Sequence, residues 1–330
     1  MNELLRVQDL YVQYNTDESE VHAVNGLSLN MHKGETMGLV GETGAGKTTL
    51  ALSILGILPE NVGNVTSGKI FYNDMDINRA SKREILSLRG KNLSMIFQDP
   101  MTSLNPIISV GDQILEVLDL HFGKMSKEQK NKKVDEILKK VGIPPERKNE
   151  YPFQFSGGMK QRIGIAMALV SEPEFLIADE PTTALDVTIQ AQILDLMKQL
   201  KTEFNTSMIM ITHDLGIVAE ICDSVSIMYA GEIIENGSVG DIYTKDNNHP
   251  YTTGLFNCIP KFDSVERRLS PIEGYMVDPT NLPTGCKFHE RCPKAMDICV
   301  SNNPSVYTYG THSIKCFLFE KWQEEDEINE

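Results

Sequence analysis

The sequence has 330 residues, of which 31 are Lys or Arg and 46 are Asp or Glu, so the formal net charge is −15. A chain of this length typically folds into about two domains, or into one large domain with an extension. The hydrophobic content of 41% and the charged content of 23% are ordinary for a globular protein and argue against disorder. The acidic balance argues against nonspecific binding to nucleic acid or anionic lipid, which needs a basic face.

The ends and the hydropathy of the chain indicate a cytosolic protein. The first residues lack the basic region and apolar run of a signal peptide, and there is no stretch of about 18 apolar residues. We therefore expect neither a signal peptide nor a membrane span. In the cytosol, clustered cysteines more often bind metal than form disulfides.

The amino-terminal part shows the pattern of strands followed by a loop and a helix. Residues 5–11 and 24–31 alternate between apolar and polar, which predicts paired strands. Residues 36–40 form a short apolar strand, and a helix is predicted over residues 49–58, where Pro59 ends it.

The middle of the chain is predicted to be helical before strands return. Residues 109–170 have helical periodicity, and Ser126 begins an amphipathic helix with capping-box spacing. Residues 175–178 and 208–211 are apolar strands, separated by a helix that begins near Val187. Alternating strands and helices predict an α/β sheet with a helical insertion.

The composition changes after about residue 245, where prolines recur and four of the six cysteines gather. We place a domain boundary there. Residues 1–245 would form the first domain, with its helical subdomain at about 100–172. Residues 246–330 would form a small, irregular C-terminal extension.

Residues 41–48 match the phosphate-binding pattern G-x-x-x-x-G-K-[ST], between a strand and a helix. Glycines let the backbone wrap around phosphates with its N–H groups pointing inward. Lys47 can reach the β- and γ-phosphates, and the Thr48 hydroxyl can bind Mg²⁺. The expected nucleotide contacts are Gly41, Glu42, Thr43, Gly44, Ala45, Gly46, Lys47, Thr48 and Thr49.

Residues 175–180 supply the acidic half of such a site. The strand ends at Asp179, whose carboxylate can hold Mg²⁺ directly or through water. Glu180 follows, where it can accept a proton from an attacking water. An acidic pair after a strand is usually a solvated strand end, but the phosphate-binding loop favours the functional interpretation.

Residues 155–162 form a third element that leads into a helix. Ser156 is a natural N-cap, and Gly157 and Gly158 expose backbone N–H groups at the positive helix end. This arrangement favours an anion. Since the chain already has one phosphate-binding loop, a second anion site suggests that two chains share each nucleotide.

In these three motifs the sequence resembles the ATP-binding subunits of ABC transporters. Residues 41–48 look like the Walker A motif, residues 175–180 like Walker B, and residues 156–159 like the family signature.

Single residues extend this resemblance over some 200 positions. Gln98 matches the Q-loop glutamine, and residues 184–186, which include Asp186, match the D-loop. His213 matches the switch histidine. Tyr14 stands where the family places an aromatic ring against adenine, with Tyr11 as the alternative.

Several segments resemble the branch of the family that imports peptides. Met159 stands where the general signature has glutamine, while the serine and glycines before it are intact. Residues 97–100 and 103–106 also resemble that branch, and residues 249–252 resemble its C-terminal extension.

The resemblance implies a P-loop NTPase fold of the ABC type with an antiparallel β subdomain. It implies ATP hydrolysis in a head-to-tail dimer, with each ATP between one chain's Walker A motif and the other's signature. Glu180 would be the general base, His213 would contact the γ-phosphate, and Gln98 would sense it. Mg²⁺ would be held through Thr48, Gln98 and Asp179, and Ser156, Gly157, Gly158 and Asp186 would complete the nucleotide contacts.

The resemblance also implies a subunit that powers the uptake of dipeptides or oligopeptides. It would lie on the cytoplasmic side of the inner membrane, bound to two transmembrane permease subunits. A substrate-binding protein would deliver the peptide to these permease subunits. Its ATP-binding partner would be a paralogue or a second copy, and no nucleic acid would bind. Alternatives are an importer of nickel chelates or other solutes, and a soluble ABC ATPase outside transport.

Cys286, Cys292, Cys299 and Cys316 have the spacing C-x₅-C-x₆-C-x₁₆-C. Structural zinc sites more often contain a short C-x₂₋₄-C knuckle, and four thiolates can equally hold an iron–sulfur cluster. Some importers of the peptide branch, which the chain resembles here, carry a [4Fe–4S] cluster at such cysteines. We therefore expect a metal-binding extension, with a [4Fe–4S] cluster and with Zn²⁺ as the alternative.

Overall fold

The computed structural model describes residues 2–183, 185–244, 247–259 and 271–321. The chain divides into two compact units. The first unit comprises Met1–Asn2, His32–Thr36 and Arg79–Ile211, and the second comprises Glu3–Met31, Met37–Asn78 and Thr212–Glu330. The predicted domain boundary at residues 245–246 and Ala184 of the predicted D-loop lie outside the described residues, so the division at residue 245 stays a prediction.

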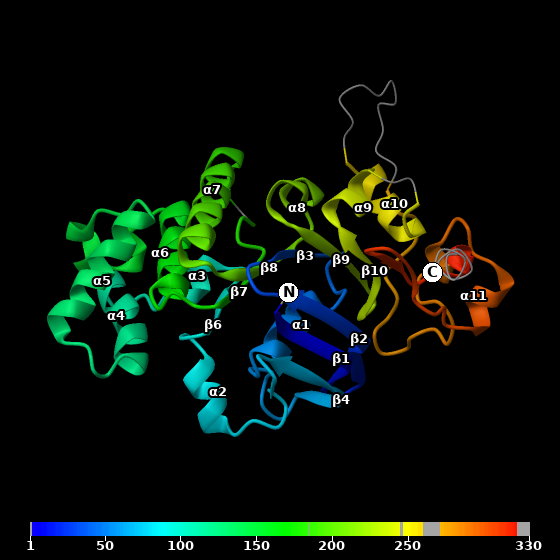
Figure 1. The fold of residues 1–330 in the computed structure, drawn as a ribbon, viewed down its shortest axis with the longest axis horizontal. Helices are drawn as coiled ribbons and strands as arrows, with labels where there is room; N and C mark the ends of the chain where they lie inside the picture. The colour runs from blue at the N-terminus through cyan, green and yellow to red at the C-terminus, as the bar shows by residue number, and fades with distance from the viewer. Residues whose placement is uncertain (1, 184, 245–246, 260–270, 322–330) are drawn as a thin grey trace. The chain divides into compact units, whose positions relative to one another are not determined.

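The second unit contains a four-stranded antiparallel sheet in its amino-terminal part (Figure 1). Its strands, in spatial order, are β2 (Glu20–His32), β1 (Glu3–Asn15), β4 (Gly63–Tyr72) and β5 (Met75–Asp76). Leu5 and Val7 of β1 pair with Tyr72 and Ile70 of β4, and all four side chains are buried. The alternating pattern of the sequence correctly predicted these paired strands, because period-two alternation buries one face of a strand.

A second set of strands in this unit leads to the phosphate-binding loop. Its order is β11 (Tyr307–Tyr309), β12 (His312–Ile314), β10 (Glu232–Ser238), β9 (Ser224–Tyr229) and β3 (Thr36–Val40). β3 is buried throughout and pairs with β9 in parallel. The helix after the loop is α1 (Lys47–Ile54). It ends before Leu58, the predicted end, because Gly56 turns the chain with a φ of 61°.

Short helices complete the second unit. They are α8 (Leu215–Ile221), α9 (Val239–Thr244), α10 (Pro250–Asn257), η3 (His289–Arg291), α11 (Asp297–Ser301) and η4 (Phe317–Phe319). The C-terminal segment is not irregular throughout, since β12 pairs with β10 through Ile314 and Glu235.

The first unit has three parallel strands in the order β8 (Ser207–Thr212), β7 (Phe175–Asp179) and β6 (Leu93–Ile96). β7 and β8 are the apolar runs of the sequence, and both are buried along their whole length. Continuous burial is typical of parallel strands, which are covered on both faces.

Helices make up the rest of the first unit. They are α2 (Lys82–Leu88), α3 (Pro100–Ser103), α4 (Val110–His121), α5 (Lys127–Lys140), η1 (Pro145–Asn149), η2 (Pro152–Gln154), α6 (Gly157–Leu169) and α7 (Val187–Phe204). Helices α4, α5 and α6 pack against one another (Figure 1). The predicted capping box is present: the Ser126 side chain accepts from the Gln129 N–H at 3.2 Å, and the Gln129 side chain accepts from the Ser126 N–H at 2.9 Å.

Candidate nucleotide-binding site

The loop after β3 has the backbone that a phosphate-binding loop requires. Gly44 and Gly46 adopt left-handed conformations, with φ of 86° and 102°. A Cβ at Gly41 would lie 2.2 Å from the Met228 carbonyl oxygen, and one at Gly46 would lie 2.3 Å from that of Ala23. Any other residue at these two positions would therefore displace the loop.

Lys47 is held by the loop itself. Its ammonium group donates to the carbonyl oxygens of Gly41 at 2.6 Å and Glu42 at 2.9 Å, and the side chain is buried. This geometry keeps the positive charge inside the curve of the loop. The predicted residues from Gly41 to Thr49 thus lie in one loop and the first turn of α1.

Of the two tyrosines proposed for adenine, Tyr14 is the one beside α1. Its hydroxyl donates to Thr49 Oγ1 at 3.1 Å, and its ring packs against Gly63. Tyr11 instead lies against Gly26, where an added Cβ would come 2.8 Å from the tyrosine oxygen. The contact with Thr49 therefore favours Tyr14.

In the first unit, the structure brings Gln98 and Glu180 together. Gln98 Nε2 donates to Glu180 Oε2 at 3.0 Å, and Thr183 Oγ1 donates to the same oxygen at 2.8 Å. Asp179, at the end of β7, is only 2% exposed. Thr183 was not predicted as a site residue, although its position three residues after Glu180 is a local signal for a hydrogen bond across a turn.

The third motif begins α6 as predicted. The Ser156 side chain accepts from the Met159 N–H at 3.4 Å, and Gly157 is exposed with open space around it. A Cβ at Gly158 would lie 2.7 Å from the Ile189 side chain of α7. Asp186 caps α7 by accepting from the Ile189 N–H at 3.0 Å, a structural role that the sequence analysis did not assign.

His213 follows β8 directly and is exposed. The next residue, Asp214, caps α8 by accepting from the N–H groups of Gly216 and Ile217. The position of His213 at the carboxyl end of a parallel strand is one at which α/β proteins bind ligands. The phosphate-binding loop, Tyr14 and His213 belong to the second unit, and the remaining predicted nucleotide residues belong to the first.

The four clustered cysteines all lie in the described part of the second unit, as free thiols. Burial raises the pKa of Cys286, Cys292 and Cys316, and the neighbouring thiols raise it further. For Cys316 the pKa rises to about 11.

The predicted metal centre is not confirmed. In the described ranges, which include all four cysteines, no group of three or more His, Cys, Asp or Glu side chains is placed to hold a metal ion. The spacing of the cysteines indicated a ligand set, but the placement of their side chains does not form one.

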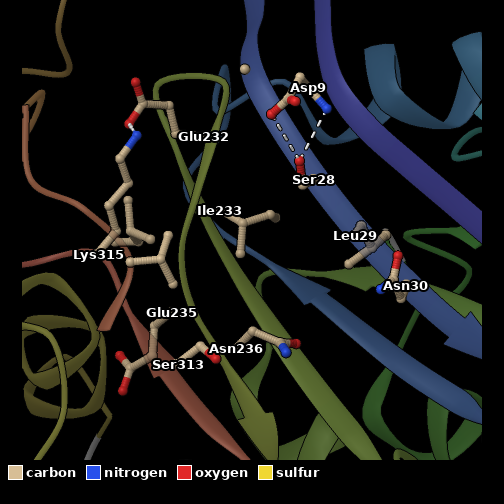
Figure 2. Close-up of a pocket in the computed structure, with 13 residues that line it drawn as sticks. Asp9, Ser28, Leu29, Asn30, Glu232, Ile233, Glu235, Asn236, Ser313 and Lys315 are labelled. Atoms are coloured by element: carbon tan, nitrogen blue, oxygen red, sulfur yellow. Dashed lines mark hydrogen bonds and ion pairs between the residues drawn. The ribbon is translucent and has the colours of Figure 1, made fainter. Parts of the chain in front are cut away.

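A pocket of about 370 Å³ lies elsewhere in the second unit, between residues of β2 and β10 (Figure 2). Among its lining residues, Lys315 pairs with Glu232 at 2.7 Å, and Asp9 accepts from the Ser28 hydroxyl at 3.3 Å. None of the predicted nucleotide-binding residues lines it. The pocket is therefore distinct from the phosphate-binding loop.

Comparison with known proteins identifies two family matches. Residues 24–183 match the ABC transporter model, and residues 234–299 match the model for the C-terminal region of oligopeptide and dipeptide transporters. Among the described residues, no helix combines the length and apolar character needed to cross a bilayer.

Curated relatives match along nearly the whole chain. The dipeptide transport ATP-binding protein DppD of Bacillus subtilis is 48% identical over 96% of this chain and 95% of its own length. The oligopeptide transport ATP-binding protein OppD of Salmonella typhimurium is 48% identical over 96% of this chain and 94% of its own. Among solved structures, the ATP-binding cassette MJ0796 bound to ADP and phosphate, a dimer, matches with a TM-score of 0.64 and 26% identity, over 72% of this chain and 99% of its own.

Proposed function

The chain belongs to the ABC transporter family, as the ATP-binding subunit of a dipeptide or oligopeptide importer, and on this premise we propose how its residues bind and hydrolyse ATP. The phosphate-binding loop carries the proposal. Its left-handed glycines, its buried lysine and the start of α1 together form a concave, positively charged cradle.

ATP would bind with its phosphates inside residues 41–49. Lys47, held by the carbonyl oxygens of Gly41 and Glu42, would contact oxygens of the β- and γ-phosphates. Thr48, Gln98 and Asp179 would hold Mg²⁺, which neutralises charge on the phosphates. Tyr14 would pack against the adenine ring.

Hydrolysis would depend on Glu180 as the general base. Gln98 and Thr183 both donate to its carboxylate, so they orient the group that accepts the proton of the attacking water. His213 would contact the γ-phosphate. Ser156, Gly157, Gly158 and Asp186 would contact the nucleotide bound by a second ATP-binding subunit, in a head-to-tail dimer.

The partner subunit would be a paralogue or a second copy of this chain. Two transmembrane permease subunits would attach the pair of ATP-binding subunits to the cytoplasmic side of the inner membrane. Residues 99–106 would form the surface on which the permease docks. A substrate-binding protein would deliver the peptide. Curated relatives named for dipeptide and oligopeptide transport support this cargo over nickel chelates or other solutes.

Co-purification tests the transporter assignment against a soluble ABC ATPase. The tagged full-length chain, isolated from its own cells in mild detergent, should bring down two permease subunits and a second ATP-binding subunit. A matched preparation of the tag alone controls for adhesion. Recovery of ribosomes or nucleic acid without permeases would overturn the assignment.

We also propose that the four clustered cysteines bind a [4Fe–4S] cluster, with Zn²⁺ as the alternative. The hydrogen bond from the Cys286 N–H to the Cys299 carbonyl oxygen, at 2.8 Å, supports the proposal because it brings two of the four cysteines close together. The side chains would have to reorient, since the described residues offer no formed metal site.

Iron, acid-labile sulfide and zinc assays on anaerobically purified protein test this proposal. A cluster predicts brown protein with iron and sulfide in nearly equal amounts. One zinc per chain would select the alternative. Metal-free protein that remains metal-free after incubation with iron and sulfide, or with zinc, would contradict both.

A further inference from the structure

Glu42, the second residue of the phosphate-binding loop, is bound at three of its groups. Its carboxylate accepts two hydrogen bonds from the Arg291 guanidinium, at 2.7 and 3.0 Å. Its N–H donates to the Tyr251 hydroxyl at 2.9 Å. Its carbonyl oxygen accepts from Lys47 Nζ at 2.9 Å. Two of these partners come from the C-terminal part of the chain, more than 200 positions away.

The Arg291 side chain is buried and held by a backbone contact. It is only 4% exposed, and its Nε donates to the Glu273 carbonyl oxygen at 3.1 Å. The hydrogen bonds that Arg291 donates to the Glu42 carboxylate raise the pKa of Arg291, so the guanidinium remains charged. A bidentate contact of this kind fixes orientation as well as distance, because the planar guanidinium matches both carboxylate oxygens.

Tyr251 is also held in place by its surroundings. The ring is fully buried and packs against Tyr229 and Phe288, with centroids 4.8 and 5.3 Å away. The Tyr251 N–H donates to His249 Nδ1 at 3.0 Å, which caps the start of α10. Burial raises the pKa of the Tyr251 hydroxyl, so it stays neutral and accepts the Glu42 N–H.

These contacts leave Glu42 little freedom to turn. Its N–H is directed to Tyr251, while its carbonyl oxygen faces the ammonium group of Lys47. Any rotation of the backbone at Glu42 would therefore move the carbonyl oxygen that accepts the hydrogen bond from Lys47. The two matched family regions meet at this point, since Glu42 lies within residues 24–183 and Arg291 within residues 234–299.

We infer that Arg291 and Tyr251 are positioning residues of the nucleotide site, through which the C-terminal extension holds the phosphate-binding loop in the shape that binds ATP. Neither residue needs to touch the nucleotide. Both act through Glu42, on the loop backbone and on Lys47. The inference rests on ATP binding by the loop and is independent of the cargo.

A double-mutant cycle on the full-length chain tests the inference. Arg291→Gln and Glu42→Gln should each weaken ATP binding about tenfold, as measured by titration with ATP and Mg²⁺. The double variant should also weaken binding about tenfold, rather than a hundredfold, because the pair acts as a unit. In steady-state hydrolysis, KM for ATP should rise while kcat changes less than about twofold.

Three further variants separate positioning from folding. Arg291→Lys keeps the positive charge but loses the bidentate contact with the Glu42 carboxylate. The affinity of this variant for ATP should therefore fall between those of the wild type and Arg291→Gln. Tyr251→Phe keeps the buried ring and should weaken ATP binding about threefold. Lys294→Gln removes the same charge from an exposed residue nearby and should leave ATP binding unchanged.

Melting temperatures without nucleotide should be recorded for every variant. Arg291→Gln and Tyr251→Phe proteins that are folded and bind ATP within twofold of the wild type would overturn the inference. So would independent effects of Arg291→Gln and Glu42→Gln that multiply in the double variant. These experiments measure ATP affinity and not transport. A chain that binds ATP but does not support peptide uptake would therefore contradict the proposed function and leave the inference standing.

Discussion

Glu180 shows how backbone strain and two hydrogen bonds place a single carboxylate. Its φ of 43° is left-handed, a conformation that costs a non-glycine residue roughly 1 kcal/mol or more. The Glu180 N–H donates to the Ile211 carbonyl oxygen at 2.9 Å, while Gln98 and Thr183 hold the carboxylate. Strain that the surroundings maintain is frequent at functional sites, which agrees with the role proposed for Glu180.

Replacing Glu180 by Gln keeps the size of the side chain and removes its ability to accept a proton. We expect ATP affinity to stay within about twofold of the wild type, while the hydrolysis rate falls about 100- to 10,000-fold. Titration with ATP and steady-state phosphate release measure the two quantities. Near-normal turnover would remove Glu180 from the catalytic role.

Thr183→Val extends this test to the orientation of the base. Losing one hydrogen bond, worth about 1 kcal/mol, should lower kcat about fivefold with little change in KM. Thr202→Val is the matched control, because Thr202 lies near the far end of α7 and its hydroxyl donates to the Lys198 carbonyl oxygen of the same helix at 2.9 Å. Equal kcat values for both variants would contradict a role for Thr183.

At the scale of elements, local patterns predicted strands and helix starts well. The apolar runs of β3, β7 and β8 are buried strands, and Ser156 caps its helix. These features depend on residues within one turn or one strand, so their causes are visible in the sequence. The end of α1 was misplaced because Pro59 is a conspicuous stop signal, whereas the backbone already turns at Gly56.

Contacts between distant elements were beyond such reasoning. Arg291 and Glu42 are 249 positions apart, and nothing in either local sequence indicates the other. Gln98 and Glu180, 82 positions apart, were both predicted as site residues, Glu180 from its place after a strand and Gln98 through resemblance, but the contact between them was not predicted. The cysteine spacing likewise predicted ligand chemistry, whereas the packing that directs each thiol is tertiary.

At the scale of the whole molecule, the net charge of −15 disfavours attachment to anionic lipid. The proposed attachment therefore runs through permease subunits. The C-terminal extension, predicted as a separate domain, is tied to the phosphate-binding loop by Arg291 and Tyr251 and to β10 by β12. Its contacts connect the part that matches peptide transporters with the part that binds ATP.

The most direct test of the account is ATP-driven uptake of a labelled peptide. The co-purified transporter, reconstituted in liposomes with its substrate-binding protein, should accumulate the peptide when ATP is present on the side of this subunit. The same complex carrying Glu180→Gln should bind ATP and accumulate almost none. Equal uptake by both complexes, or uptake of a nickel chelate or a sugar oligomer but no peptide, would contradict it.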